Sequence, residues 1–335
     1  MRGDAPGGGR PGAPVLLTVT DLSFAYGESS EPVLTGVALT LRAGEALGVL
    51  GRNGAGKSTL INAVLDIVPG RRGGRIVLGE AGEGDDLGGS TGSTEGTRGT
   101  RGAGGAGGTA ARRHIGVAGQ RISLYKKLTV AENLTHAARL VLPRRDVAAA
   151  VGRAVEDFGL ARVARTPVHR LSGGWERLSH IAASFVHAPR VRFLDEPTTA
   201  LDFETRSRLV TLMARWRDAG DAMIVTSHYP EDIEEMCTHV AVVSGGTVVG
   251  VGPLPDLLGG YRSELLVRVE SRGGPATLRA PAPTTVAEAA ETFARWARDP
   301  EHGGSAVESV RLTSRNLREI ISMDPDLRGS VVEND

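Results

Sequence analysis

A glycine-rich stretch between an apolar strand and a helix constrains this chain more than any other feature. Residues 51–58 read Gly-Arg-Asn-Gly-Ala-Gly-Lys-Ser, which fits the spacing G-x-x-x-x-G-K-[ST]. Glu45–Leu50 before it predicts a buried strand, and Ser58–Val68 after it predicts a helix. Glycines let backbone N–H groups turn onto phosphate oxygens, and a helix that begins there adds its positive dipole end. The pattern therefore predicts a phosphate loop.

The residue types in this loop suit a nucleoside triphosphate. Lys57 is expected to neutralise the β- and γ-phosphates, and the Ser58 hydroxyl is expected to ligate Mg²⁺. Lysine is rare in this chain, and its compact charge suits phosphate. The other positions expected to contact the nucleotide are Gly51, Asn53, Gly54, Ala55, Gly56 and Thr59.

Two adjacent carboxylates follow a second apolar strand, which is predicted over Val191–Leu194. Asp195 ends this strand, where it can face a metal ion through water. Glu196 follows; it either points at an attacking water or merely caps the turn at Pro197. Arg192 interrupts the apolar run, so it either reaches the sheet edge or pairs with an acid.

Two shorter motifs accompany these groups. Leu171-Ser172-Gly173-Gly174 precedes a helix that is predicted to begin near Trp175, and Ser172 lies 23 residues before Asp195. Taken alone, Ser-Gly-Gly before a helix is an ordinary N-cap. Ser227-His228 comes just after a strand predicted over Ala222–Thr226, and Pro230 opens the next helix.

The four motifs, in this order, resemble the nucleotide-binding subunit of an ATP-binding cassette (ABC) transporter. The resemblance covers about residues 15–255 and implies ATP and Mg²⁺ as cofactors, with Glu196 as general base for ATP hydrolysis. It also implies that Leu171, Ser172, Gly173 and Gly174, here called the signature corner, bind the γ-phosphate of ATP held by the opposite subunit. Two cassettes placed head to tail would then enclose two ATP molecules, which makes ATP the agent of dimer closure.

The resemblance assigns roles to four more residues. Gln120, after a strand predicted over Ile115–Ala118, matches the loop that senses Mg²⁺ or water and touches the membrane partner. Asp202 matches the loop that crosses the dimer interface, and it also fits a helix N-cap. His228 matches the switch histidine that binds the γ-phosphate. Tyr26 matches the residue that stacks on adenine; the alternative is a core aromatic at a strand end.

The pattern of elements predicts three parts. Residues 1–14 are Gly- and Pro-rich and are expected to be disordered. Residues 15–260 are expected to form the ABC cassette, an α/β phosphate-loop fold with a mostly parallel sheet, an antiparallel β portion and a helical subdomain over 129–190. Residues 262–335 predict a small α+β accessory domain, with strands over Glu264–Glu270 and Val307–Leu312.

Local signals place several further elements. Thr129 and Glu132 form a capping box, and Asp146 is expected to cap a helix over Val147–Phe158. Strands are predicted over Val15–Thr20 and near Arg75–Leu78, and helices over Glu204–Asp218, from Thr285 to about Arg298, and over about Asn316–Met323.

Residues 79–110 are expected to form a flexible surface insertion in the cassette, because 13 of these 32 residues are glycine. A tolerated loop and a regulatory or membrane-surface role are both open for it.

Composition limits the classes of partner. The chain has 39 basic and 39 acidic residues, so no nucleic-acid partner is expected. No stretch reaches the ~18 apolar residues that a membrane helix needs, and the N-terminus lacks the apolar core of a signal peptide. Cys237 is the only cysteine, so no intrachain disulfide is possible. If the chain serves a membrane process, as the resemblance implies, a separate multi-span permease would cross the membrane and hold this chain at the cytoplasmic face.

We expect the ATP-hydrolysing subunit of an ABC transporter, as a homodimer or paired with a related cassette. Residues Val248–Leu258 and the segment from Val310 to Ile321 resemble bacterial drug- and lipid-exporter ATPases, which favours export. Arg318 departs from that tail, where an acid is common. The alternatives are a soluble ABC ATPase in repair, ribosome or cofactor-assembly work, and a nucleotide-binding regulator without turnover.

Overall fold

The structure is a computed structural model that describes residues 12–27, 31–79, 85–86, 113–254, 265–271, 274–279 and 307–314. The chain divides into two compact units, Met1–Pro253 and Leu254–Asp335. Most of the N-terminal segment predicted to be disordered, nearly all of the glycine-rich insertion and both helices predicted after residue 280 lie outside the described residues.

A six-stranded sheet forms the centre of the first unit, in the order β10-β9-β3-β8-β7-β6. All neighbouring pairs are parallel except β9 and β10. The strands β3, β7 and β8 are buried on both faces, as expected for parallel strands covered on both sides. The bounds are β3 (Ala46–Leu50), β6 (Ile115–Ala118), β7 (Val191–Asp195), β8 (Ala222–Ser227), β9 (His239–Ser244) and β10 (Thr247–Pro253).

A smaller antiparallel sheet of order β2-β1-β4-β5 packs against the same core. Its strands are β1 (Val15–Ala25), β2 (Leu34–Arg42), β4 (Arg71–Leu78) and β5 (Asp85–Asp86). The first strand runs beyond the predicted end at Thr20. The chain shifts register between Val19 and Leu22, with Asp21 at a φ of 52°, and the strand continues across this bulge. Beyond this bulge, Leu22 and Phe24 return to the core.

The helix α1 (Lys57–Val64) lies between the two sheets and buries Leu60, Ile61 and Val64 against both. It is shorter than the predicted Ser58–Val68. Leu65 is its C-cap, and Asp66 turns the chain into the left-handed region with a φ of 54°. This conformation ends the helix.

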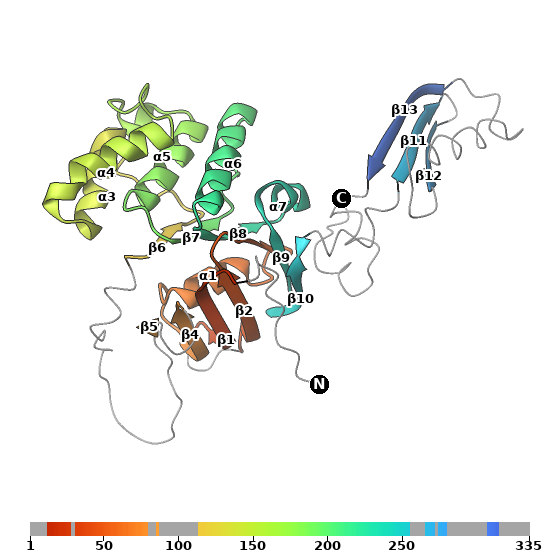
Figure 1. The fold of residues 1–335 in the computed structure, drawn as a ribbon, viewed down its shortest axis with the longest axis horizontal. Coiled ribbons are helices and arrows are strands. Elements are labelled where there is room, and N and C mark those ends of the chain that lie inside the picture. The colour runs from red at the N-terminus through yellow and green to blue at the C-terminus, as the bar shows by residue number, and fades with distance from the viewer. Residues whose placement is uncertain are drawn as a thin grey trace, which may run out of the picture. The chain divides into compact units, whose positions relative to one another are not determined.

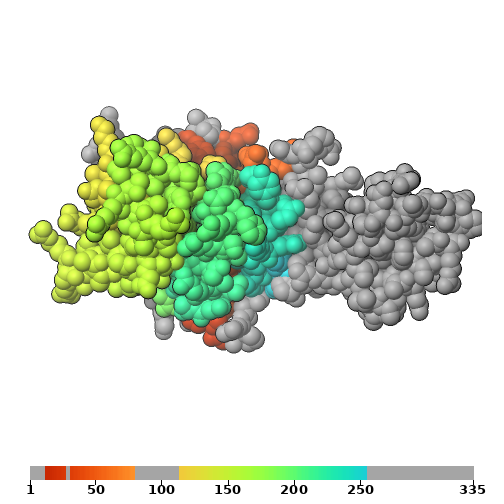
Figure 2. All heavy atoms as spheres, turned by 90° about the horizontal axis from the view of Figure 1, so that it is seen from above, coloured from red at the N-terminus to blue at the C-terminus, as the bar shows by residue number. Residues whose placement is uncertain are grey.

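The remaining helices of the unit gather on the other side of the central sheet (Figure 1). They are α3 (Val130–Val141), α4 (Arg144–Asp157), the 3₁₀ turn η1 (Val168–Arg170), α5 (Gly173–Phe185), α6 (Phe203–Asp218) and α7 (Pro230–Met236). The face drawn in Figure 2 shows side chains of α3–α5 massed at one end, with those of α6 beside them.

Two of the helix N-termini test the predicted caps. At α3 the capping box is confirmed, since Thr129 Oγ1 accepts from Glu132 N and the Glu132 carboxylate accepts from Thr129 N. The prediction that Asp146 caps the next helix is wrong. That helix, α4, begins at Arg144 with Pro143 at the N-cap, and Asp146 lies inside its first turn. The fixed φ of proline already suits a helix start.

Parallel pairing brings the carboxyl ends of three strands to one edge of the sheet. Leu50 of β3 lies opposite Ser227 of β8, and Asp195 of β7 lies opposite Thr226. The segments that follow these strands begin at Gly51, Glu196 and His228. All three therefore emerge side by side, at the edge where α/β sheets bind ligands.

The second unit contains an antiparallel three-stranded sheet of order β12-β11-β13. Its strands are β11 (Leu265–Ser271), β12 (Gly274–Arg279) and β13 (Val307–Ser314). Strands β11 and β13 match the strands predicted over Glu264–Glu270 and Val307–Leu312, whereas β12 was not predicted.

Candidate nucleotide site

The phosphate loop folds over the N-terminus of α1. Gly56 is the N-cap of α1 with a φ of 106°, a conformation that glycine adopts without strain. At Gly51 a side chain is excluded, because an added Cβ would lie 2.5 Å from Val243 O of β9. The loop therefore presents backbone rather than side chains at the start of the helix, as a phosphate cradle requires.

Lys57 lies inside this loop. Its Nζ donates hydrogen bonds to Gly51 O at 2.6 Å and to Arg52 O at 3.0 Å. Burial lowers the pKa of Lys57, and the nearby carboxylates of Glu196 and Asp195 oppose that shift. The loop thus holds a desolvated cation beside two acids at the sheet edge.

Asp195 is buried at the end of β7 and receives two hydroxyl groups. Ser58 Oγ donates to Asp195 Oδ1 at 3.2 Å, and Thr226 Oγ1 of β8 donates to the same oxygen. The Ser58 bond joins the phosphate loop to the strand across 137 positions of sequence. Ser58 and Asp195, both predicted to serve a metal ion, are therefore in direct contact.

Glu196 lies between the two other residues predicted to act in catalysis. Gln120 Nε2 donates to Glu196 Oε2 at 3.1 Å, and His228 Nδ1 lies 3.3 Å from Glu196 Oε1. The backbone of Glu196 is in the left-handed region, with a φ of 47°. Its carboxylate thus faces Gln120 and His228, whereas the turn at Pro197 is closed by the backbone bond from Thr199 N to Glu196 O.

The signature corner forms the N-terminus of α5. Ser172 is the N-cap and is exposed, but its hydroxyl makes no capping hydrogen bond. The interpretation of Ser172 as an ordinary side-chain cap is therefore wrong. A Cβ added at Gly174 would lie 3.3 Å from Asp202 Oδ2, which places the predicted dimer loop against this corner within one subunit.

Asp202 also caps a helix, as its alternative interpretation predicted. Its Oδ1 accepts from Thr205 N at 2.8 Å at the start of α6. These backbone hydrogen bonds lower the pKa of the Asp202 carboxyl. The residue after it, Phe203, is 86% exposed.

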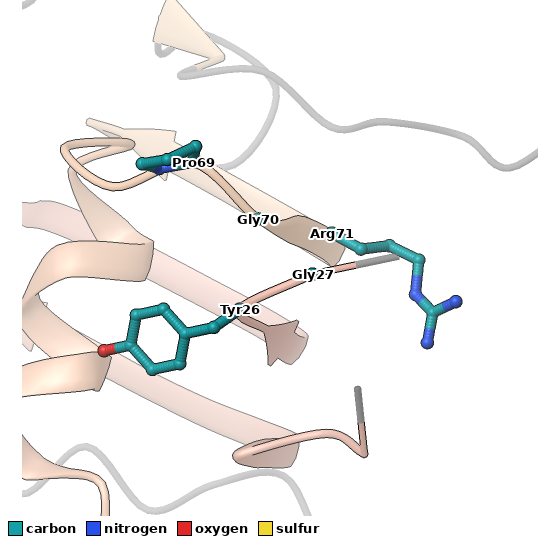
Figure 3. Close-up of a pocket in the computed structure, with 5 residues that line it drawn as sticks. All are labelled: Tyr26, Gly27, Pro69, Gly70 and Arg71. Atoms are coloured by element: carbon teal, nitrogen blue, oxygen red, sulfur yellow. The ribbon is translucent and has the colours of Figure 1, made fainter. Parts of the chain in front are cut away.

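Tyr26 lies at the end of β1 beside a cleft of about 710 Å³, which Gly27, Pro69, Gly70 and Arg71 also line. Figure 3 shows its ring pointing toward the helix while the Arg71 side chain extends away from it. The Tyr26 hydroxyl bonds Thr59 Oγ1 at 2.9 Å, and the ring meets Phe24 edge-on at 5.1 Å. Tyr26 is 48% exposed as a residue, so it is not a core aromatic.

Arg192 pairs with an acid, the second of the two predicted alternatives. It is 3% exposed, and its guanidinium contacts Asp221 Oδ2 at 2.6 Å and covers the Trp216 ring at 4.4 Å from the centroid.

Three residues around the site were not singled out from the sequence. Thr226 donates to Asp195, and Arg177 of α5 donates to the backbone at the ends of β6 and β7. Asp232 of α7 accepts from Thr198, Ser227 and Arg206. Buried Asp232 thereby joins the start of the dimer loop to the segment that carries His228. A charged residue among the apolar positions of α5 is the one sequence signal that pointed to Arg177.

Together, the fold and this site define a phosphate-loop ATPase. A family model described as ABC transporter matches residues 34–199. Nod factor export ATP-binding protein I from Ralstonia nicotianae is 30% identical over 308 residues, which cover 90% of this chain and 87% of that protein. The chain therefore belongs to the ABC transporter ATP-binding family and is an ATP-hydrolysing transporter subunit.

Other relatives show the same cassette in different transport settings. Linearmycin resistance ATP-binding protein LnrL from Bacillus subtilis is 28% identical over 259 residues (77% of this chain, 76% of that protein). Methionine import ATP-binding protein MetN from Caulobacter vibrioides is 32% identical over 244 residues (72% and 68%). The solved ATP-binding subunit of an ABC transporter superposes with a TM-score of 0.60 at 26% identity, covering 73% of this chain and 93% of that one.

Within the parts of the chain that the structure describes, no helix is both long enough and apolar enough to span a bilayer.

Proposed function

We propose that this chain powers a separate membrane permease, in the direction of export, through ATP-driven closure of a dimer. One observation carries the proposal: Glu196 is held between Gln120 and His228 at the sheet edge that also bears the phosphate loop. This grouping supports Glu196 as a base beside the loop proposed to bind a triphosphate. The assignment of residues 15–260 as the cassette and 262–335 as an accessory domain belongs to the same proposal.

Nucleotide binding is assigned to the loop and the aromatic cleft. Backbone N–H groups of Gly51–Thr59 and the start of α1 receive the phosphates, and Lys57 exchanges its carbonyl partners for phosphate oxygens. Tyr26 is an exposed residue that lines the cleft, which supports it as a surface on which adenine can stack.

The residues around Ser58 fit Mg²⁺. Hydroxyl, amide and carboxylate oxygens are the hard donors that this ion prefers, and Ser58 and Asp195 already lie 3.2 Å apart. We assign Ser58 and Gln120 as ligands and Asp195 as a ligand through water. When bound, the ion neutralises charge on the β- and γ-phosphates.

Hydrolysis is assigned to the residues around Glu196. Its carboxylate takes a proton from the attacking water, Gln120 orients that water, and His228 hydrogen-bonds the γ-phosphate. The two neighbours of the carboxylate also fix its direction before nucleotide arrives, so less rearrangement is needed at the moment of reaction.

The dimer is supported by the signature corner. The uncapped Ser172 hydroxyl and the N-terminus of α5 form a second anion site, distant in sequence from the phosphate loop. A second cassette, identical or related, can supply the triphosphate for it. ATP then contributes interface charge that neither protein surface carries alone, so binding closes the pair and hydrolysis opens it.

The direction of transport is supported by two relatives whose names refer to export or resistance. A membrane permease would hold the chain at the cytoplasmic face of the cell membrane. The rival class, a soluble ABC ATPase in repair, ribosome or cofactor-assembly work, predicts no such partner.

The test compares Glu196→Gln with Glu204→Gln, a carboxylate on the exposed face of α6. With saturating Mg-ATP, Glu196→Gln is expected to lose turnover and to accumulate an ATP-bound dimer by size exclusion with light scattering. Glu204→Gln should keep wild-type turnover. A strictly monomeric Glu196→Gln variant would contradict the split site, and undiminished turnover would contradict the base.

A second measurement separates the transporter from the soluble class. Purification in detergent should recover the chain in fixed stoichiometry with one multi-span protein that stimulates its ATPase activity. Cells that lack the chain should retain the transported compound, whereas an importer would leave them depleted of it. Recovery without any membrane protein would favour the soluble ATPase.

A further inference from the structure

One buried arginine joins the signature helix to both catalytic loops. Arg177 Nη1 donates to Gly119 O and Gln120 O, each at 2.8 Å. Its Nη2 donates to Asp195 O at 2.7 Å and to Glu196 O at 2.9 Å. A single guanidinium therefore holds four carbonyl groups, two just after β6 and two at the end of β7.

The position of Arg177 on α5 connects these bonds to the signature corner. The residue lies five positions after Ser172, in the second turn of the helix whose N-terminus is the signature corner. It is 3% exposed, and its rigid fork of donors suits several acceptors at once. Any rigid movement of α5 is therefore passed to the backbone of Glu196 and Gln120 through direct hydrogen bonds.

The bonds also explain how Glu196 keeps an unfavourable backbone conformation. Its φ of 47° is uncommon for a residue with a side chain. On the amide side, Glu196 N donates to Thr226 O at 3.2 Å and to Thr226 Oγ1 at 3.0 Å. Arg177 donates to Asp195 O in that same peptide group and to Glu196 O in the next one. The peptide groups on both sides of Glu196 are thus fixed, which aims the carboxylate at Gln120 and His228.

A second residue of the same helix bonds only one of the two segments that Arg177 holds. His180, one turn further along α5, contacts Gly119 O at 3.3 Å and accepts from Ser123 N at 3.4 Å. His180 therefore fastens only the segment of Gln120. Among the described residues of α5, only Arg177 hydrogen-bonds the Glu196 segment. Loss of Arg177 should therefore act on the proposed base even though His180 still holds the Gln120 segment.

We infer that Arg177 is a positioning residue that sets the proposed general base, Glu196, and the segment of Gln120 against the signature corner of the same subunit. The inference rests on the proposed function. Contact of the signature corner with a partner's triphosphate would restrict the movement of α5. Through the hydrogen bonds of Arg177, the backbone of Glu196 would then be restricted as well. Each cassette would then reach its full hydrolysis rate only when the neighbouring nucleotide is engaged.

The first experiment separates chemistry from binding. Arg177→Met is expected to lower kcat for ATP by about 10- to 100-fold, the scale of a misplaced catalytic group, with KM changed by less than about threefold. Arg177→Lys should recover part of kcat, because an ammonium has three donors for four carbonyls. The matched control is Arg192→Met, an equally buried arginine on β7 whose partner is Asp221, which should keep kcat.

The second experiment asks which end of α5 the arginine serves. In the Glu196→Gln background, Arg177→Met should still allow the ATP-dependent dimer, because the signature corner keeps its backbone N–H groups. Loss of that dimer would overturn the inference and make Arg177 a support of the corner. A kcat equal to that of Arg192→Met, or an effect confined to KM, would also overturn it.

Misfolding of the variant and failure of the proposed function can each be distinguished from failure of this inference. If Arg177→Met does not fold, Arg177→Lys decides alone: a kcat reduced several-fold at unchanged KM supports the inference, and a wild-type kcat overturns it. If the wild type does not hydrolyse ATP, or if Glu196→Gln alone forms no dimer, the proposed function fails instead.

Discussion

His228 and Glu196 meet across the ends of two neighbouring parallel strands, with His228 Nδ1 3.3 Å from Glu196 Oε1. The strands β7 and β8 fix this distance, because Asp195 and Thr226 lie opposite each other in register just before the two residues. The sheet itself therefore sets the spacing of the proposed catalytic pair, and α7 begins just beyond it, at Pro230.

Replacing His228 should slow hydrolysis more than it weakens binding. His228→Ala removes a donor for the γ-phosphate and a neighbour of the base, so kcat is expected to fall by about 100-fold, with a small change in KM. Steady-state ATPase kinetics test this. His169→Ala is the control, since His169 is exposed and contacts Lys126 O outside the site. Equal kcat values for the two variants would contradict the role of His228.

Lys57 should dominate nucleotide affinity. Lys57→Ala is expected to weaken ATP binding by about 10- to 100-fold, in line with the about 1.5–3 kcal/mol that hydrogen bonds to charged groups contribute. Fluorescent ATP titration or calorimetry measures the change. Arg52→Ala serves as the comparison, because Arg52 is an exposed cation of the same loop and should cost far less. Unchanged affinity in Lys57→Ala would contradict the phosphate-loop assignment.

The pair of Arg192 and Asp221 predicts an order of stabilities. Asp221→Asn leaves the buried guanidinium without its carboxylate and is expected to cost about 3–5 kcal/mol. Arg192→Met should cost less, because Met fills the space beside Trp216 while Asp221 keeps Arg190 as a neighbour at 3.8 Å. Urea unfolding followed by tryptophan fluorescence gives both values. The reverse order would show that the pair is not what holds Arg192.

His180 predicts a loss of stability in acid. Burial, and then the charge of Arg177, lower the pKa of His180 from 6.5 to about 4. The unfolded chain therefore binds more protons between these two values, so stability present at neutral pH is lost as the pH falls through this window. The loss is bounded at roughly 3 to 4 kcal/mol, because the shift spans about 2.5 pKa units at roughly 1.4 kcal/mol per unit.

The test of this pH dependence uses a side chain that stays neutral. His180→Asn should lose less stability than the wild type when urea unfolding is compared at about pH 7.5 and about pH 5. Exposed His114→Asn should follow the wild type. An acid-sensitivity unchanged by His180→Asn would rule out His180 as the source.

Local elements of the cassette were largely predictable. The strand Ile115–Ala118 and the capping box at Thr129 lie where the residue pattern placed them. The strand Leu34–Arg42 was missed, although Leu39 and Leu41 alternate with polar residues in the manner of a half-buried strand. Asp146 misled because a good capping residue lay three positions inside a helix that proline had already started.

The site needed tertiary information. The sequence motifs predicted which residues belong to the site, but Ser58 meets Asp195 and Gln120 meets Glu196 only because β3, β8, β7 and β6 lie in that order. Strand order is set by packing over the whole sheet and leaves no local signal. The bonds of Arg177 depend on the docking of α5 beside β6 and β7, which no spacing rule predicts.

The left-handed backbone at Glu196 has a thermodynamic consequence. Glycine would occupy that φ without steric penalty, so Glu196→Gly is expected to gain stability relative to Glu196→Ala, by about 1 kcal/mol. Both variants remove the proposed water-activating carboxylate, and the glycine variant would be the more stable of the two. Conformational strain and catalytic capacity are thus concentrated in one and the same peptide unit.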